Sequence, residues 1–235
     1  LEEAIDQLGA SIGVYAGKES IRISANTLAR NYEATLALME EILLEPRWDT
    51  TEFELAKQRT ISQIRQQEAN PNAIASNAYD ILIYGKNDIR AQNRLGTIET
   101  VNNLTIEDLK TYYTSFISPS VARFHVVGDI SQQDLVASLK GLESRWKAKS
   151  VVLPELPKPS APEKSQVYFF DVPDAKQSVL TIGYPSMPAT DEDYYPAVVM
   201  NYILGGGGFA SRLTQELREG KGYTYGIRSG FSGNK

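Results

Sequence analysis

A proline-rich segment at residues 151–165 restricts most strongly how this chain can fold. Its sequence, VVLPELPKPSAPEKS, places four prolines among small and charged residues. Proline fixes the φ angle and has no N–H group to donate, so we expect an extended linker here. The segment therefore predicts a first domain at residues 1–150 and a second domain at residues 166–235.

The first domain shows the periodicities of both strands and helices. Apolar residues alternate over 11–16 and 21–28, which predicts a β-hairpin. Apolar residues three and four apart then predict four helices, followed by a strand and a last helix. The helices are expected near residues 32–43, 53–64, 71–84, 105–116 and 131–146, and the strand at 121–127.

The second domain has a shorter mixed pattern. Strands are expected at 167–172, 178–184 and 223–231, and helices at 195–204 and 209–218. Together the two patterns predict an α+β fold in which helices pack on largely antiparallel sheets. About 70 residues after the linker are few for an independent core. Because the chain also begins without Met, we expect two truncated domains, the first cut at its N-terminus and the second at its C-terminus.

The cysteine and histidine content limits the chemistry of the chain. There is no Cys, and His125 is the single His. Zinc sites use Cys, His and carboxylate ligands, so the chain cannot by itself build a Cys₄, Cys₂His₂ or two-His site. A Cys nucleophile and a disulfide framework are excluded as well. The alternation over 121–127 favours a position within a sheet for His125 over a catalytic role.

The charge and hydropathy of the chain are those of an ordinary globular protein. The net charge of −5 gives no support for binding a nucleic-acid backbone. No apolar run approaches the length of a membrane span. The first residues have neither the basic nor the apolar region of a signal peptide. We therefore expect no nucleic-acid partner, no membrane span and no signal peptide.

Four consecutive glycines follow a predicted helix: Gly205, Gly206, Gly207 and Gly208. A phosphate-binding loop would need a Gly-Lys-Ser/Thr sequence, and a dinucleotide fingerprint would need a preceding strand. The glycines have neither, and the end of a helix followed by a loop explains them.

Arg218 and Tyr223 lie on either side of a Gly-Lys-Gly turn between a predicted helix and a predicted strand. Both side chains donate hydrogen bonds and could point together at a peptide carbonyl. Ordinary turn chemistry and strand aromatics explain the same residues without a site.

The sequence around this turn resembles a known family. LGGGGFASRL at 204–213 and LREGKGYTYG at 217–226 are similar to the pitrilysin/insulinase family of zinc peptidases, which includes mitochondrial processing peptidase and core proteins of respiratory complexes. LGAS at 8–11 with VYA at 14–16, EANP at 68–71, GTIE at 96–99 and VVGDI at 126–130 also resemble family segments. The resemblance therefore covers nearly the whole chain.

The resemblance implies that this chain does not hold zinc. Active halves of the family carry a His-x-x-Glu-His motif and a third, glutamate ligand on a later helix. The chain lacks the motif, and TISQI at 60–64 matches the later helix, which places Gln63 at the third-ligand position. A second family carboxylate matches Ala56. Neither side chain can replace an anionic ligand. The alternative is that a zinc motif lies upstream of Leu1 and that Gln63 is misaligned with the third-ligand position.

The resemblance also implies a division of work between two related halves. One half holds zinc and cleaves peptides, while the other closes over the substrate with an Arg and a Tyr that Arg218 and Tyr223 match. Residues 205–208 resemble the glycine-rich loop of the non-catalytic processing-peptidase subunit, in a shorter form. We therefore expect a non-zinc-binding unit of a metalloendopeptidase, inactive alone, that binds peptide substrate.

The partner implied is a zinc-binding half of the same family, in the same polypeptide or in a separate subunit, and a homo-oligomer is a further option. Zinc is the expected cofactor of that partner half, and no cofactor is expected in this chain. A bacterial periplasmic or envelope location follows by family analogy only. The alternative function is a structural or peptide-binding scaffold of the same fold that performs no hydrolysis.

Overall fold

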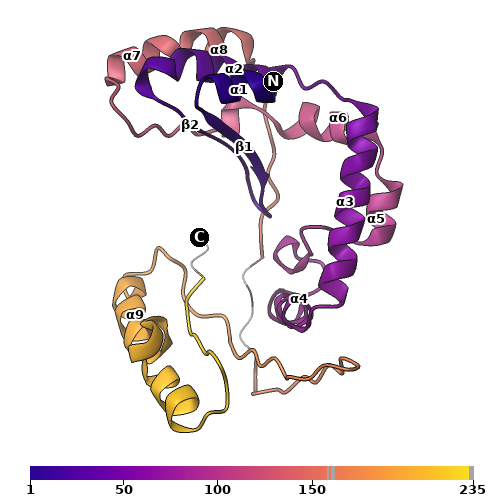
Figure 1. Cartoon of the computed structure of the whole chain (residues 1–235), viewed down its shortest axis with the longest axis vertical. Helices are drawn as coiled ribbons and strands as arrows, with labels where there is room; N and C mark the ends of the chain where they lie inside the picture. The colour runs from indigo at the N-terminus through magenta and orange to yellow at the C-terminus, as the bar shows by residue number, and fades with distance from the viewer. Residues whose placement is uncertain (158, 160–161, 233–235) are drawn as a thin grey trace. The chain divides into compact units, whose positions relative to one another are not determined.

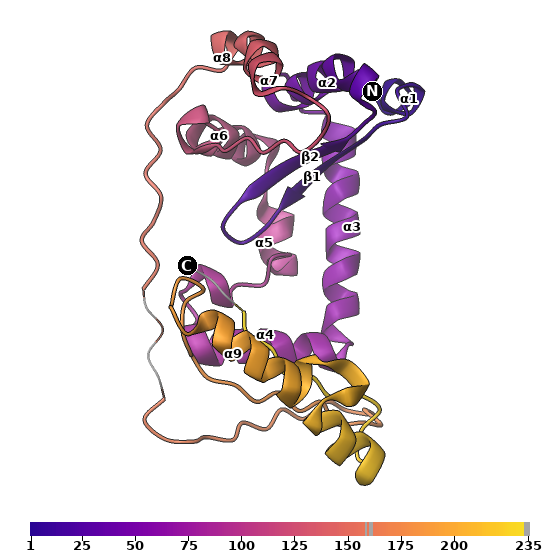
Figure 2. The same ribbon diagram turned by 90° about the vertical axis from the view of Figure 1, so that its left-hand side faces the viewer.

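Helices and one β-hairpin form the regular structure of the computed structural model, which describes residues 1–157, 159 and 162–232 (Figures 1 and 2). The hairpin consists of β1 (Ser11–Ala16) and β2 (Ile21–Asn26), which pair antiparallel with Ser11 opposite Asn26. The helices are α1 (Glu2–Gln7), α2 (Tyr32–Leu44), α3 (Thr50–Glu68), α4 (Pro71–Tyr84), α5 (Ile98–Asn103), α6 (Ile106–Phe116), α7 (Gln132–Ser138), α8 (Lys140–Arg145) and α9 (Tyr194–Asn201). Among the described helices, none is both long and apolar enough to cross a membrane.

Side-chain caps start two of the central helices. The Asp49 carboxylate accepts hydrogen bonds from the Thr51 and Glu52 N–H groups at 2.8 and 3.0 Å, which satisfies two free donors at the start of α3. Thr105 and Asp108 form a reciprocal capping box at the start of α6. The Thr105 hydroxyl and N–H lower the pKa of the Asp108 carboxyl, because both donate to its ionised form.

A small apolar core lies between α3 and α5. Ile61 and Ile64 of α3 and Val101 of α5 are each at most 5% exposed, with Leu95 and Ile98 packed against them. The two α3 residues are three apart and so share one face of the helix. The helix α5 is not among those that the periodicity predicts, because six residues are too few to display a helical repeat.

The helices α2, α7 and α8 lie side by side (Figures 1 and 2). The Tyr32 hydroxyl of α2 lies 3.0 Å from the Ser138 hydroxyl of α7, and Arg145 of α8 pairs with Glu40 of α2. From α6, the Tyr113 hydroxyl donates to the Leu43 carbonyl at 2.7 Å, and burial raises the pKa of that hydroxyl. Polar contacts therefore join segments more than 60 residues apart in sequence.

A buried ion pair contacts the backbone at Pro157. The Arg90 guanidinium donates to both Asp88 carboxylate oxygens, from Nε at 2.8 Å and from Nη2 at 2.7 Å. It stacks on the Tyr84 ring, with Cζ 4.5 Å from the ring centroid, and also donates to the Pro157 carbonyl. The Asp88 and Arg90 side chains are only 2% and 12% exposed. We call Tyr84, Asp88, Arg90 and Pro157 the arginine clamp.

The chain forms two compact units. The first contains Leu1–Pro159 and Gln166–Ile182, and the second contains Ser160–Ser165 and Gly183–Lys235. The described part of 151–165 has neither helix nor strand, and Lys158, Ser160 and Ala161 of the predicted linker lie outside the described residues. The domain boundaries predicted from the prolines stay a prediction.

Four predicted strands are wrong. Residues 121–127, 167–172, 178–184 and 223–231 have no strand pairing, and among the described residues only β1 and β2 form a sheet. A strand needs a neighbour for its backbone hydrogen bonds, and apolar alternation alone does not supply one. The apolar side chains are accordingly open to solvent, with Val127, Val167 and Phe169 at 102%, 97% and 87% exposure. We call these four ranges the uncovered segments.

The α+β class is confirmed, since helices combine with an antiparallel hairpin. The predicted hairpin and the helices at 32–43, 53–64, 71–84 and 105–116 match the structure closely. The predicted helix at 131–146 divides into α7 and α8 around Leu139. His125 lies exposed in an uncovered segment, so its predicted sheet position is wrong.

Candidate functional site

The glycines and Arg218 lie on or between consecutive short helical turns of the second unit. A π-helical turn, η4 (Tyr202–Gly206), extends α9 and contains the first glycines. A 3₁₀ turn, η5 (Gly208–Ala210), follows, and then a second π-helical turn, η6 (Thr214–Gly220), which carries Arg218. π-turns are rare and occur often at functional sites.

The first three glycines are tightly packed. A Cβ atom on Gly205 would lie 2.8 Å from the Ser229 nitrogen and 2.9 Å from Leu213 Cδ1, and it would also meet the Ser229 hydroxyl. One on Gly207 would lie 2.7 Å from the Tyr202 carbonyl oxygen. Gly208 instead has a φ of 63°, which L side chains rarely adopt. Close packing and backbone conformation therefore both require glycine here.

Gly205→Ala is expected to destabilise the second unit by about 1 to 3 kcal/mol, the usual cost of overpacking a closed site. Gly230→Ala is the matched control, because a Cβ there would meet nothing within 4 Å. Urea unfolding followed by circular dichroism measures both variants. Equal stability of the two variants would contradict the close packing of Gly205.

A hydrogen-bond network holds the chain between the glycines and Arg218. The Ser211 hydroxyl donates to the Gly208 carbonyl at 2.8 Å and lies 3.0 Å from the Thr214 hydroxyl. Ser211 and Thr214 are 1% and 5% exposed. The Gln215 side-chain amide donates to the Phe209 carbonyl at 2.7 Å. The backbone of Gly208 and Phe209 is therefore fixed to the start of η6.

The Arg218 guanidinium lies over an aromatic ring. Its guanidinium carbon lies 4.6 Å from the centroid of the Phe209 ring, within the range of a cation–π contact. Its Nε lies 3.5 Å from Glu219 Oε1. The Arg218 side chain is 34% exposed, so it is partly covered and still reaches solvent.

Tyr223 lies three residues after the end of η6. Its N–H donates to the Leu217 carbonyl at 2.9 Å, and the Gly222 N–H donates to the Arg218 carbonyl at 3.0 Å. Gly222 has a φ of 63°, the left-handed conformation that commonly ends a helix. These backbone bonds tie Tyr223 to the turn that carries Arg218, and the Tyr223 side chain is 78% exposed.

An ion pair closes the same turn on the solvent side. Lys221 Nζ lies 2.9 Å from Glu216 Oε1. The hydrogen bond and charge of Lys221 lower the pKa of the Glu216 carboxyl, because they favour its ionised form.

The residues at the expected zinc position do not fit a metal. Gln63 and Ala56 both lie on α3, and both side chains are exposed. Among the described residues, no group of three His, Asp or Glu side chains is placed to hold a metal ion. An amide and a methyl group offer no anionic ligand, so these two positions do not supply the zinc ligands that active relatives have there.

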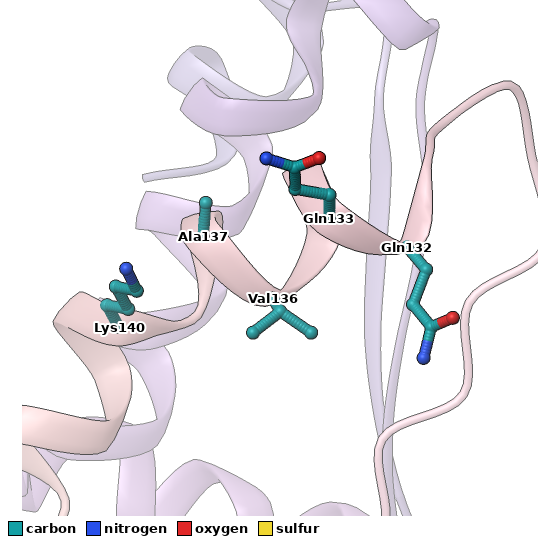
Figure 3. A pocket seen from close by; sticks show the side chains of 5 residues that line it. All are labelled: Gln132, Gln133, Val136, Ala137 and Lys140. Atoms are coloured by element: carbon teal, nitrogen blue, oxygen red, sulfur yellow. The ribbon is translucent and has the colours of Figure 1, made fainter.

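A hollow beside α7 does not form a second site. Figure 3 shows the side chains of Gln133 and Ala137 on α7 and Lys140 at the start of α8 pointing one way, and those of Gln132 and Val136 pointing the other. The side chains do not converge on one point, and Lys140 is the single charged group among them. This arrangement lacks the convergent polar groups of a binding pocket.

The structure adds residues to the candidate site that the sequence does not predict. Phe209 lies nine positions before Arg218, a spacing that no helical rule connects. Asn201 and Ser229 form two hydrogen bonds with each other, at 3.0 and 2.7 Å, that join α9 to residues 223–231. Only Ser211 has a recognisable signal, because Ser three residues before Thr214 at a helix start is typical of a cap.

Comparison with known proteins gives consistent matches. Residues 103–235 match the family model described as the peptidase M16 inactive domain. The chain is 24% identical over 232 residues to a Bacillus subtilis protein named uncharacterized zinc protease YmxG, covering 97% of this chain and 54% of that protein. It is also 24% identical over 234 residues to a Helicobacter pylori protein named non-peptidase homolog YmxG, covering 98% of this chain and 53% of that one.

A solved structure supports the same assignment. The crystal structure of a peptidase M16 inactive domain from Pseudomonas fluorescens superimposes with a TM-score of 0.82 and 26% identity, covering 99% of this chain and 56% of that one. The chain thus spans about half the length of the relatives that it matches.

Proposed function

The chain belongs to the peptidase M16 family, within the part described as its inactive domain, and from this premise we propose that it is a substrate-binding, non-zinc half of a metalloendopeptidase. The pitrilysin/insulinase resemblance is confirmed by the family match and by relatives named zinc proteases. In the proposal, a partner half of the same family holds zinc and cleaves the peptide.

The observation that carries the proposal is the family match over residues 103–235, which includes the turn bearing Arg218 and Tyr223. The residues on α3 support it, because Gln63 and Ala56 supply no anionic ligand. The absence of Cys and the single His125 agree with a chain that holds no zinc of its own. Zinc therefore enters the proposal only as a component of the partner half.

The residues of this chain act on the substrate in the proposal. Arg218 donates hydrogen bonds to a peptide carbonyl and adds positive charge beside it. Tyr223 adds a hydroxyl donor from the start of the next segment. Together they hold the peptide in one orientation and favour the negative oxygen that develops as the bond is cleaved. Residues 205–208 fix the start of the turn and take part in substrate recognition.

The test combines the complete protein with each candidate partner, that is, each protein of the same genome that carries a His-x-x-Glu-His half. The protein and each candidate partner are purified separately and as a mixture. Metal content and the cleavage of quenched-fluorescent peptides of mixed sequence are then measured for each sample. We expect zinc in the partner, none in this protein, and cleavage that increases when the two are combined. Where both halves lie in one polypeptide, the intact polypeptide replaces the mixture. Zinc bound by this half, or a partner whose cleavage is the same without it, would contradict the proposal.

The second candidate is a scaffold of the same fold that performs no hydrolysis. The Helicobacter pylori relative named a non-peptidase homolog favours it. The same experiment separates the two functions, because a scaffold would form a stable complex without increasing cleavage. A bacterial periplasmic or envelope location remains part of the proposal by family analogy.

A further inference from the structure

Phe209 and Arg218 form a contact that the proposed function does not use. The ring and the guanidinium lie 4.6 Å apart, measured from the ring centroid to Cζ. They come from different turns, η5 and η6, so helical spacing alone does not create the contact. Phe209 is 68% exposed, so burial in a core does not account for the position of its ring beside Arg218.

The backbone beneath the ring is held from several directions. Gln215 donates to the Phe209 carbonyl, and the buried Ser211 hydroxyl donates to the preceding Gly208 carbonyl. Gly208 provides the positive φ that turns the chain before Phe209. The ring therefore projects from a fixed point beside Arg218.

A guanidinium held against a ring loses less conformational entropy on binding a ligand than a free guanidinium does. Arginine has a long side chain with many rotamers, and restricting them before binding reduces the entropy lost on binding. A cation–π contact is made through charge and not through a hydrogen bond, so it leaves the N–H groups along the guanidinium edge available for a carbonyl. The Glu219 carboxylate, 3.5 Å from Nε, lies next to that edge.

We propose that Phe209 is a positioning residue that holds the Arg218 guanidinium in the orientation that binds the substrate carbonyl. The proposal rests on the proposed function, since it gives Phe209 a role only through Arg218. Phe209 itself makes no hydrogen bond to the substrate through its side chain. The position requires an aromatic ring, so Tyr retains the function and Leu does not.

The test is a double-mutant cycle in the complete protein together with its zinc-binding half. The variants are Phe209→Leu, Phe209→Tyr, Arg218→Ala and the double variant Phe209→Leu/Arg218→Ala, assayed for kcat and KM with quenched-fluorescent peptides of mixed sequence. Tyr195→Leu is the matched control, because Tyr195 is 76% exposed in the same unit and its ring packs on Tyr194. Melting temperatures identify variants that fail to fold.

Phe209→Leu is expected to lower kcat/KM about 2- to 5-fold, the effect of one exposed cation–π contact. Phe209→Tyr and Tyr195→Leu should both stay near the parent value. The double variant should match Arg218→Ala, because Phe209 acts only through that side chain.

The other outcomes contradict either the positioning role of Phe209 or the role of Arg218 in the proposed function. If Arg218→Ala lowers activity and Phe209→Leu does not, the positioning role is wrong while the proposed function stands. If the losses from the two single variants multiply, or Tyr fails to restore activity in a folded protein, Phe209 does not act through Arg218. If Arg218→Ala has the parent activity, the substrate-binding role of Arg218 is wrong, and the positioning role of Phe209 is wrong with it.

Discussion

Arg218→Ala is expected to lower kcat/KM for peptide cleavage about 10²-fold in the complete protein combined with the zinc-binding half that we propose, the usual loss for one removed transition-state donor. The substitution removes a charged donor that is partly exposed and already oriented beside Phe209. Tyr223→Phe removes only a hydroxyl and is expected to produce a loss of the same order. Steady-state kinetics with quenched-fluorescent peptides measures both.

Arg212→Ala is the matched control for charge, because Arg212 is an exposed arginine of the same unit. Its activity should stay near that of the parent. Turnover at the parent rate in both Arg218→Ala and Tyr223→Phe would rule out the substrate-binding role. An equal loss in Arg212→Ala would show that the net charge of the surface matters and not the position of Arg218.

Arg90→Ala is expected to destabilise the first unit by about 3 kcal/mol, because it leaves the Asp88 carboxylate buried without its partner. It also removes the stacking on Tyr84 and the hydrogen bond to Pro157. Urea unfolding measures the loss. Arg145→Ala is the matched control, since Arg145 is 47% exposed in its pair with Glu40 and should cost less than about 1 kcal/mol. Equal losses in the two variants would contradict the arginine clamp.

The arginine clamp also predicts a dependence on pH. Chiefly through the hydrogen bond from its side chain, Arg90 lowers the pKa of Asp88 from 3.8 to about 2. A lowered carboxyl pKa gives stability that is fully present above pH 4 and is lost as the pH falls towards 2, here about 2 kcal/mol. Asp88→Asn should remove this part of the acid dependence. An unchanged dependence between pH 4 and pH 2 would show that other carboxyl groups cause it.

Local signals predict the helices and the hairpin well. Asp49, Asn70 and Thr105 are capping residues whose effect depends on the next three residues alone, so the sequence around them is sufficient. The arginine clamp could not be predicted in this way, because Arg90 and Pro157 are 67 residues apart. In the uncovered segments the local pattern predicts structure that is absent. Their alternation favours strands, but a strand forms only where a second segment pairs with it.

The candidate site is likewise predicted by local sequence only in part. Arg218 and Tyr223 follow from the family resemblance, and the end of η6 between them follows from Gly222. The contact with Phe209 depends on how η5 turns onto η6, which is set by Gly208, Ser211 and Gln215 acting together. No single spacing in the sequence contains that information.

The uncovered segments also affect how soluble the chain is. Val167–Tyr168–Phe169–Phe170 combines β-branched and aromatic residues without charge or proline, a composition that promotes aggregation through strand pairing between molecules. Asp171 and Pro173 follow immediately and act as gatekeepers, since a charge and a missing N–H both interrupt such pairing. Replacing these two residues would therefore be expected to reduce the yield of soluble protein even where the folded structure is unchanged.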